Sequence, residues 1–517
     1  MKRCVELQDS PPASNADQPL GYIQNQRSFL QLAFLGRRGV RVEPILLSML
    51  LILFVFPLGL FLALSVPLGQ VPDEAAHVAR MESLLHGEIV GRRGNGPDFN
   101  GRPIALPGVI INAGPYIVTS KAIDATADHK MTADILARLN HIPWANQLSF
   151  VYAPNTAVYF PVFYLPGALG LGLARLSGLT PLGAVLVARA VSFCAYVVVA
   201  ILALMIAQRG WRLIFVTLAL PMTLWLAASC NEDGLLIACS CLVASLLTRA
   251  PGPKNAWYWA AAMLLACIIA VKPAYLPLVI FMLLPCTDFT KSDLIRGGCG
   301  MLVAGLPGII WAFLTLHYVS GPFGWWSPYH PGPLWPGDPT RLFAGTDPEA
   351  QAMVFIHRPS LMLMLPLRTI YASGLRYLHE AVGVLGILNL KIAEAMFDFW
   401  FVALGFAVLG DVLAPGQADQ PRVCFALIAL LSIVATVFAI FDAEYLTWST
   451  VGRSPVIDGF QGRYALPLLP LVAVALPPLQ RPMRASFRAA LTTPAVAAAA
   501  VGVAYLPVLV IERYYLH

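Results

Sequence analysis

The sequence predicts an all-α integral membrane protein that crosses the bilayer many times. Of its 517 residues, 58% are hydrophobic and only 12% are charged, whereas soluble domains carry about 25% charged residues. Long apolar stretches recur along the chain, and a spanning helix needs roughly 20 apolar residues. Lys and Arg gather between these stretches, which is the pattern that sets the orientation of a polytopic protein. No basic tract is interleaved with aromatic residues, so we expect no nucleic-acid partner.

The first apolar stretch, residues 44–68, contains no charged residue and follows Arg37, Arg38 and Arg41. By the positive-inside rule, residues 1–43 form a cytoplasmic N-terminal segment and the chain emerges near Gly69. The polar start is too long for a secretory signal, so we expect the first apolar stretch to stay in the protein.

The next apolar stretch, residues 159–173, is short and contains two prolines. If it crossed the membrane, Arg209 and Arg212 would lie outside. If it lies in the outer interface, all later basic clusters fall inside. We therefore expect an interfacial or re-entrant helix within a long first outer loop, residues 69–182.

The remaining apolar stretches bring the predicted number of spans to about eleven. The ten later spans are 184–206, 213–229, 235–249, 256–271, 274–286, 299–317, 397–413, 424–443, 464–479 and 489–510. They complete a transmembrane domain, residues 44–511, with a second outer loop at 318–396 and an outer tail at 512–517. The loops contain no cysteine, which argues against a disulfide framework and a cysteine-based metal site.

Polar groups gather at the outer face in this topology. QVPDEAAHVAR, residues 70–80, follows the first span. The other groups are Asn231-Glu232-Asp233 between the third and fourth spans, Lys272 at the end of the fifth, and Asp442, Glu444, Asp458, Gln461 and Arg463 between the ninth and tenth. A charge at the bilayer centre costs about 2.5–3.5 kcal/mol on insertion scales. Proton-coupled carriers place such groups near the midplane, whereas a ring at one face suits chemistry on a membrane-anchored substrate.

QVPDEAAHVAR has a local explanation, because Pro72 and two acids are favourable at a helix start. A helix would also place Asp73, His77 and Arg80 on one face, which favours a binding surface. A metal site is a weaker alternative, because no second carboxylate–histidine pair has matching spacing. We expect no metal and no cofactor, although a divalent ion stays open.

The other clusters also have two interpretations. Residues 231–233 could be a polar turn, and Lys272 or Arg463 could be interfacial anchors. Against this, Gln461-Gly462-Arg463 places a guanidinium and a flexible glycine at the start of a span, where a phosphate could bind. A Trp-rich stretch of the second outer loop, residues 321–339, is typical of an interfacial aromatic belt. The alternative is that sugar rings stack on Trp325 or Trp326.

Several ordered blocks resemble a known family. They are Pro72-Asp73-Glu74-Ala75-Ala76-His77, residues 159–166, Pro221-Met222-Thr223 with residues 229–233, Lys272-Pro273-Ala274-Tyr275, residues 382–386, and Gln461-Gly462-Arg463-Tyr464. The chain resembles, over most of residues 50–479, the bacterial polytopic proteins catalogued as a domain of unknown function and grouped in the GT-C glycosyltransferase clan. The clan's Ser-x-x-Asp turn is present only in altered form, at residues 229–233.

The resemblance implies a GT-C-like fold and a glycosyltransferase of the bacterial inner membrane. Such an enzyme moves a sugar from a polyprenyl-phosphate donor to a hydroxyl of a glycan or lipid acceptor at the extracytoplasmic face. The general base would be Asp73, with Glu74 as the alternative. The expected substrate-binding residues are His77, Arg80, Asn231, Asp233, Lys272, Tyr275, Gln461 and Arg463.

Lys272 and Arg463 would neutralise the lipid phosphate, and an apolar groove would hold the polyprenyl tail. A flippase or transporter of lipid-linked glycans, a glycan ligase or polymerase, and a non-catalytic assembly partner remain open alternatives. The oligomeric state is not predicted.

Overall fold

The computed structural model describes residues 42–97, 99–126, 129–250, 252–286, 290–321, 327–413, 423–476 and 485–516. It is mostly helical with few strands, which confirms the helical membrane fold. Three groups of residues used in the predictions lie outside the described residues. They are nearly all of the predicted cytoplasmic segment, residues 1–43, the basic residues Arg422, Arg481 and Arg484 of the predicted inner loops, and Trp325 and Trp326.

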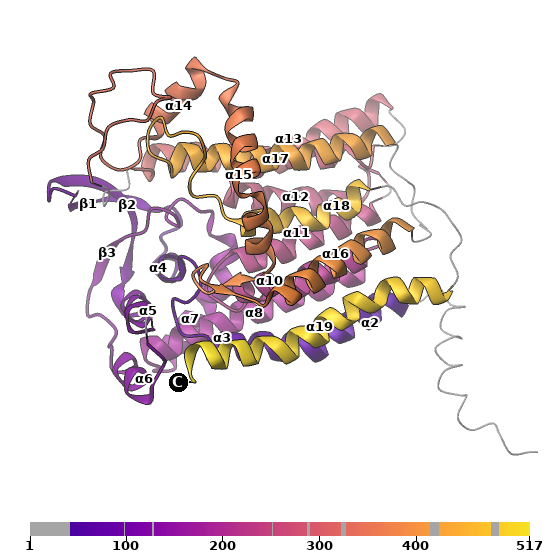
Figure 1. Cartoon of the computed structure of the whole chain (residues 1–517), viewed down its shortest axis with the longest axis horizontal. Coiled ribbons are helices and arrows are strands. Elements are labelled where there is room, and N and C mark those ends of the chain that lie inside the picture. Colours follow the sequence, from indigo (N-terminus) through magenta and orange to yellow (C-terminus); the bar gives the residue numbers. More distant parts are fainter. Residues whose placement is uncertain are drawn as a thin grey trace, which may run out of the picture.

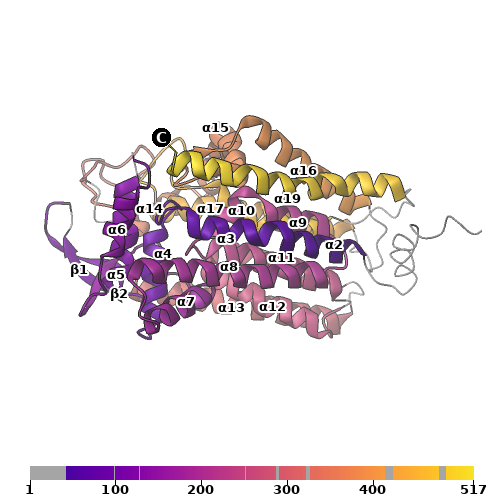
Figure 2. The same ribbon diagram turned by 90° about the horizontal axis from the view of Figure 1, so that it is seen from below.

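Long helices run roughly parallel to one another and form the body of the molecule (Figures 1 and 2). They are the first helix, built from α2 (Val42–Leu50), a π-helical turn η2 (Leu51–Val55) and α3 (Phe56–Ser65), followed by α8 (Pro181–Ile206), α13 (Lys291–Tyr318), α16 (Glu394–Leu413), α17 (Val423–Thr447) and α19 (Ala485–Tyr514). Among the described residues, these contain six apolar helices long enough to cross a membrane. Since α19 extends to Tyr514, the predicted outer tail at 512–517 begins inside this helix.

The predicted count of eleven spans is not confirmed, because the other apolar segments are short or broken. These segments are α9 (Trp211–Ala219), α10 (Pro221–Ala227), α11 (Asp233–Arg249), α12 (Ala256–Val271), η4 (Pro273–Leu283), η5 (Gly462–Leu468) and α18 (Leu469–Ala475). Proline has no N–H and restricts the preceding residue, which interrupts a helix where the prolines of these segments occur. Every residue from Arg212 to Asp233 is buried, and irregular backbone at membrane depth is tolerated where protein surrounds it.

The first outer loop is not purely helical, in contrast to the all-α prediction. Strands β1 (Arg92–Pro97), β2 (Pro103–Asn112) and β3 (Leu148–Tyr152) form an antiparallel sheet in the order β1-β2-β3. Val109 opposes Val151, and Gly108 pairs with both Arg92 and Tyr152. The apolar run at residues 104–111 could have indicated a strand, but the polar β1 carries no such signal.

Helices of the same loop pack between the sheet and the body. They are α4 (Glu74–Leu84), α5 (Ala113–Thr126) and α6 (Ala133–Asn140), followed by the short 3-10 helix η3 (Pro161–Tyr164) and α7 (Leu165–Leu176). The sequence predicted a helix at residues 159–173, and η3 with α7 occupies residues 161–176. Leu165, Leu169, Leu173 and Leu176 of α7 are exposed, so this helix presents an apolar stripe to its surroundings.

The second outer loop contains α14 (Pro348–His357), α15 (Leu361–Gly383) and the two-stranded pair β4 (Val384–Leu385) and β5 (Leu390–Lys391). Helix α15 runs across the direction of the long helices (Figure 1). Its exposed side carries Leu363, Leu367, Tyr371, Leu375 and Leu378, spaced as one helical face. Its opposite side packs against η5 and α17 and positions the segment that precedes Arg463.

Candidate functional site

Asp73 has an unusual backbone conformation at the start of α4. Its φ of 62° and ψ of 10° are left-handed, and its side chain does not cap the helix. Non-glycine residues rarely adopt this region, although Asp and Asn tolerate it best. The carboxylate points away from the helix, and Oδ2 accepts a hydrogen bond of 3.0 Å from Nη2 of Arg463. The Asp73 side chain is 39% exposed, so one face of this carboxylate is open.

Arg463 lies in η5 and is almost completely buried, with a 2% exposed side chain. Besides Asp73, its nearest carboxylate is that of Asp233, with Nε 3.8 Å from Oδ2. Nε and Nη1 form no hydrogen bond with any described residue. A buried donor without a partner costs about 1–3 kcal/mol. Both nitrogens are fully enclosed, so an anionic oxygen could satisfy them only after neighbouring side chains move.

Lys272 enters the same cluster from the break between α12 and η4. Its ammonium forms an ion pair with Oδ1 of Asp233 and lies 3.8 Å from Oε1 of Glu232. It also lies over the ring of Tyr464, 5.0 Å from the centroid. Because of these contacts, Lys272 points into the protein. They argue against the alternative interpretation, in which Lys272 only anchors the chain at the membrane interface.

His77 and Asn231 belong to a buried network behind Asp73. The N–H of Asp233 donates to Asn231 Oδ1 at 2.7 Å, which turns the amide nitrogen toward His77. Asn231 Nδ2 then donates to Nε2 of His77 at 3.0 Å. This pattern assigns the proton of a neutral His77 to Nδ1, which lies 2.8 Å from Oε2 of Glu232.

Tyr164 completes this network, because its hydroxyl donates to Glu232 Oε2 at 2.9 Å. Burial alone would raise the pKa of Glu232, but His77, its hydrogen bond and the Lys272 charge lower it to about 2. Glu232 therefore stays ionised and ties α4, η3 and the turn before α11 together. Tyr164 and Glu232 were not among the predicted site residues.

Glu74 is engaged on both oxygens, which argues against Glu74 as the alternative base. Arg189 of α8 donates from Nε to Oε1 at 2.7 Å and from Nη2 to Oε2 at 2.6 Å. The backbone N–H groups of Gly69 and Cys230 donate to the same carboxylate. Burial raises its pKa, but Arg189 and these hydrogen bonds outweigh that effect and hold the pKa below its ordinary value. Glu74 fastens α4 to α8 and has no free face.

Arg80 does not share the environment of Asp73 or His77, contrary to the expected binding face. Its guanidinium donates to the backbone carbonyls of Glu88, Ile89 and Tyr159. Because burial lowers the pKa of Arg80 only to about 10, the side chain stays charged at neutral pH. Through these contacts Arg80 stabilises the outer loop, which argues against a role as a substrate ligand.

Tyr275 and Gln461 lie on either side of η5. The buried Tyr275 hydroxyl donates to the carbonyl of Tyr464 at 2.8 Å, so it supports the turn that carries Arg463. Oε1 of Gln461 is buried without a hydrogen bond from any described residue. Of these two predicted ligands, only Gln461 has free capacity to bind.

Glu444 is a further carboxylate beside the cluster. The sequence placed it with Asp442 in a loop, whereas both lie in the last turns of α17. The charges of Lys272, Arg463 and Asp73 all act on the Glu444 carboxyl, which therefore lies near the cluster. A charged residue at the end of an apolar stretch is a recognisable signal, but its partners depend on the packing of α17. Across the described ranges, no three His, Cys, Asp or Glu side chains are grouped so as to hold a metal ion.

The comparisons with known proteins give a family. The family described as "Predicted membrane protein (DUF2142)" matches residues 56–472, which include all the site residues described above. The chain belongs to this family. No curated protein and no solved structure matches the DUF2142 chain. The family match and the apolar helices together establish a membrane protein with several candidate spans.

Proposed function

We propose that this protein is a membrane glycosyltransferase that moves a sugar from a polyprenyl phosphate to an acceptor hydroxyl at the extracytoplasmic face. One observation carries the proposal. A half-open carboxylate, Asp73, is paired with the buried Arg463, two of whose N–H groups form no hydrogen bond within the described part of the chain. A base and an anion-binding cation thus lie within 3.0 Å of each other.

The reaction needs these two groups at one place. The acceptor oxygen attacks the anomeric carbon while the bond from that carbon to the phosphate oxygen breaks. The electron pair leaves with the polyprenyl phosphate, and the acceptor proton passes to the Asp73 carboxylate. A positioned general base contributes about 10²–10⁴-fold. Cations aimed at the departing phosphate stabilise the charge that develops there.

Arg463 suits the phosphate better than Lys272 does. It carries a planar guanidinium, whose geometry matches phosphate, and its Nε and Nη1 donate no hydrogen bond to any described residue. Lys272 is held by Asp233, so it contributes positive charge rather than a free donor. Asp73, Asp233 and Glu232 lie close to Lys272 and Arg463, so a bound phosphate would compete with these carboxylates for the two cations. This competition weakens phosphate binding and favours release of the product lipid.

His77, Asn231 and Glu232 act on the reaction indirectly. They fix the first turn of α4 against the turn before α11. Asn231 Nδ2 also lies 3.4 Å from the carbonyl of Pro72, next to the left-handed Asp73. We assign them as positioning residues that hold the Asp73 carboxylate at Arg463.

The test compares a deletion strain carrying wild-type protein, Asp73→Asn, or the surface control Asp134→Asn. We expect Asp73→Asn to lose the envelope glycan and to accumulate sugar-loaded polyprenyl phosphate on the outer face. The control should behave as wild type, since the Asp134 side chain is 77% exposed. Accumulation on the inner face would indicate a flippase, and normal glycans with Asp73→Asn would refute the proposal.

A further inference from the structure

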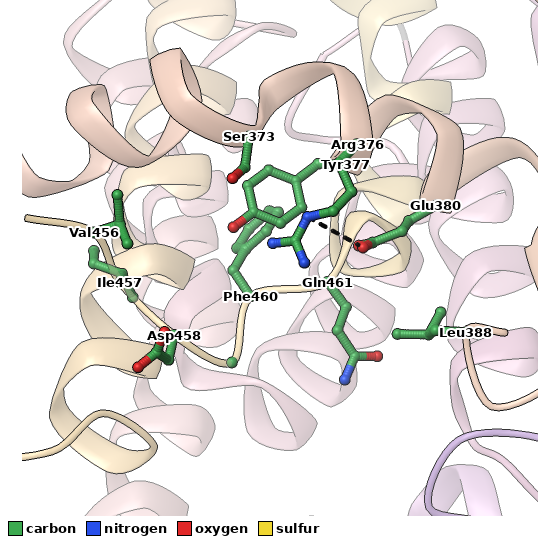
Figure 3. Close-up of a pocket in the computed structure, with 11 residues that line it drawn as sticks. Ser373, Arg376, Tyr377, Glu380, Leu388, Val456, Ile457, Asp458, Phe460 and Gln461 are labelled. Carbon is green, nitrogen blue, oxygen red and sulfur yellow. Dashed lines mark ion pairs between the residues drawn. The ribbon is translucent and has the colours of Figure 1, made fainter.

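A cavity of about 240 Å³ lies between α15 and the segment that leads into η5 (Figure 3). Ser373, Arg376, Tyr377 and Glu380 of α15 line one side. Asp458 and Gln461 line the other. None of its α15 residues was among the predicted site residues.

The walls of the cavity combine aromatic rings with paired charges. The Tyr377 and Phe460 rings meet edge to face at 4.7 Å, and Phe460 stacks on Phe441 at 3.8 Å. Arg376 and Glu380, one turn apart on α15, form an ion pair of 3.7 Å along one wall of the cavity. Rigid rings with a few placed donors and acceptors are typical of small-ligand sites. This mixture suits a sugar ring, which has apolar faces and hydroxyl groups on its rim, better than an apolar tail.

The amide of Gln461 supplies an independent sign of a ligand. Its Oε1 is buried and receives no hydrogen bond from the described part of the chain, although Gln461 lines the cavity. Buried polar atoms without partners are rare, and each calls for an explanation. Because this oxygen has almost no exposed surface, a ligand hydroxyl in the cavity would donate to it only once the amide turned toward the cavity.

The cavity borders the charged cluster at two points. Gln461 precedes Gly462 and Arg463 in the chain, and the N–H of Gly462 donates to Glu380 Oε2 at 2.9 Å. Gly459 also lines the cavity, and a Cβ placed there would lie 2.7 Å from Oε2 of Glu444. The charges of Lys272, Arg463 and Asp73 in turn act on Glu444. The cavity therefore adjoins the charged cluster, with Glu444 and the chain at Gly462 between them.

We infer that this cavity binds a sugar residue of the acceptor. The inference rests on the proposed function, since it assigns the donor phosphate to Arg463 and the acceptor to the neighbouring cavity. The acceptor is then a hydroxyl-rich glycan rather than a hydroxyl on an otherwise apolar lipid.

The direct test measures sugar binding without any donor. Saturation-transfer difference NMR is recorded on the full protein in phospholipid nanodiscs with methyl glycosides of glucose, galactose, mannose and N-acetylglucosamine. We expect at least one glycoside to bind the wild type. Ser373→Trp should fill the cavity and abolish the signal, whereas Leu375→Trp, on the exposed side of the same helix, should keep it. Gln461→Leu, which removes the free acceptor, should weaken binding about tenfold.

Three outcomes overturn the inference. These are no signal with any glycoside at its solubility limit, an equal signal with Ser373→Trp and wild type, and an unchanged affinity with Gln461→Leu. If Ser373→Trp does not fold, Gln461→Leu decides.

Binding of undecaprenyl phosphate, followed by intrinsic tryptophan fluorescence, separates this result from the proposed function. Glycoside binding without lipid phosphate binding refutes the donor assignment alone. Lipid phosphate binding without glycoside binding refutes the cavity assignment alone. A loss of lipid phosphate affinity in Gln461→Leu would assign the cavity to the donor and also overturn the inference.

Discussion

Asp73 and Glu74 are adjacent in the chain, yet each binds a different arginine. Asp73 pairs with Arg463 at 3.0 Å, while Glu74 is enclosed by Arg189 and backbone N–H groups. The left-handed backbone at Asp73 turns the two carboxylates to different sides. One remains partly open and the other is fully buried, so the two can be separated by mutation.

Asp73→Asn should lower kcat by about 10²–10⁴-fold, because the amide cannot accept a proton. Asn tolerates the left-handed conformation, and Asp233 still lies near the buried Arg463, so the loss of one counter-charge should lower the melting temperature only slightly. Transfer kinetics with purified protein measure the change, with Asp134→Asn as the matched control. An unchanged kcat would exclude Asp73 as the base.

Arg463→Lys should weaken binding of undecaprenyl phosphate about tenfold, because a lysine keeps the charge but loses the planar pair of N–H groups. Intrinsic fluorescence in nanodiscs gives the dissociation constant. Arg138→Lys is the matched control, since Arg138 is exposed and paired only with Asp134. Equal affinity of both variants for undecaprenyl phosphate would show that Arg463 does not bind the phosphate.

Glu74→Gln should destabilise the protein by about 3–5 kcal/mol, because Arg189 would be left buried without its counter-charge. The double variant Glu74→Gln/Arg189→Met should recover part of this loss, since it removes the uncompensated charge. Thermal unfolding in nanodiscs measures both. If Glu74→Gln melts like wild type but transfers no sugar, Glu74 rather than Asp73 would be assigned as the base.

Stability should fall as the pH is lowered from about 4.5 toward 2. The pKa of Glu232 is lowered from 4.5 to about 2 in the folded protein, and that of Glu74 is also lowered. A lowered acid pKa stabilises the folded state above the unfolded-state pKa, and the gain is lost as the pH falls to the folded value. Glu232→Gln should flatten the dependence of the melting temperature on pH in this window. An equally steep dependence in both proteins would contradict the assignment.

The sequence predicted the membrane class, the helical fold and the convergence of the polar blocks, because apolar length and basic residues carry that information locally. It predicted that Asp73, Asp233, Lys272 and Arg463 lie near one another, and the structure brings these four together. Their pairing could not be predicted, since contacts such as Asp73 with Arg463 join residues 390 positions apart.

Other features depended on packing that no local pattern reveals. Arg189 stands alone in the apolar stretch 181–206, and this isolated charge could have indicated a buried partner. That the partner is Glu74 follows only from the packing of α3 against α8, which brings the start of α4 to Arg189. Arg80 has the correct helical spacing for the predicted face, but the outer loop wraps around it and uses its donors.

Helix α15 has a consequence for how a substrate would arrive. Its exposed Leu363, Leu367 and Leu375 lie opposite the side that lines the cavity. If acyl chains cover that exposed stripe, the cavity opens at the depth of the lipid headgroups. A lipid-linked substrate would then search for it by lateral diffusion in two dimensions, and the rate would follow its mole fraction in the membrane rather than its concentration in bulk solution.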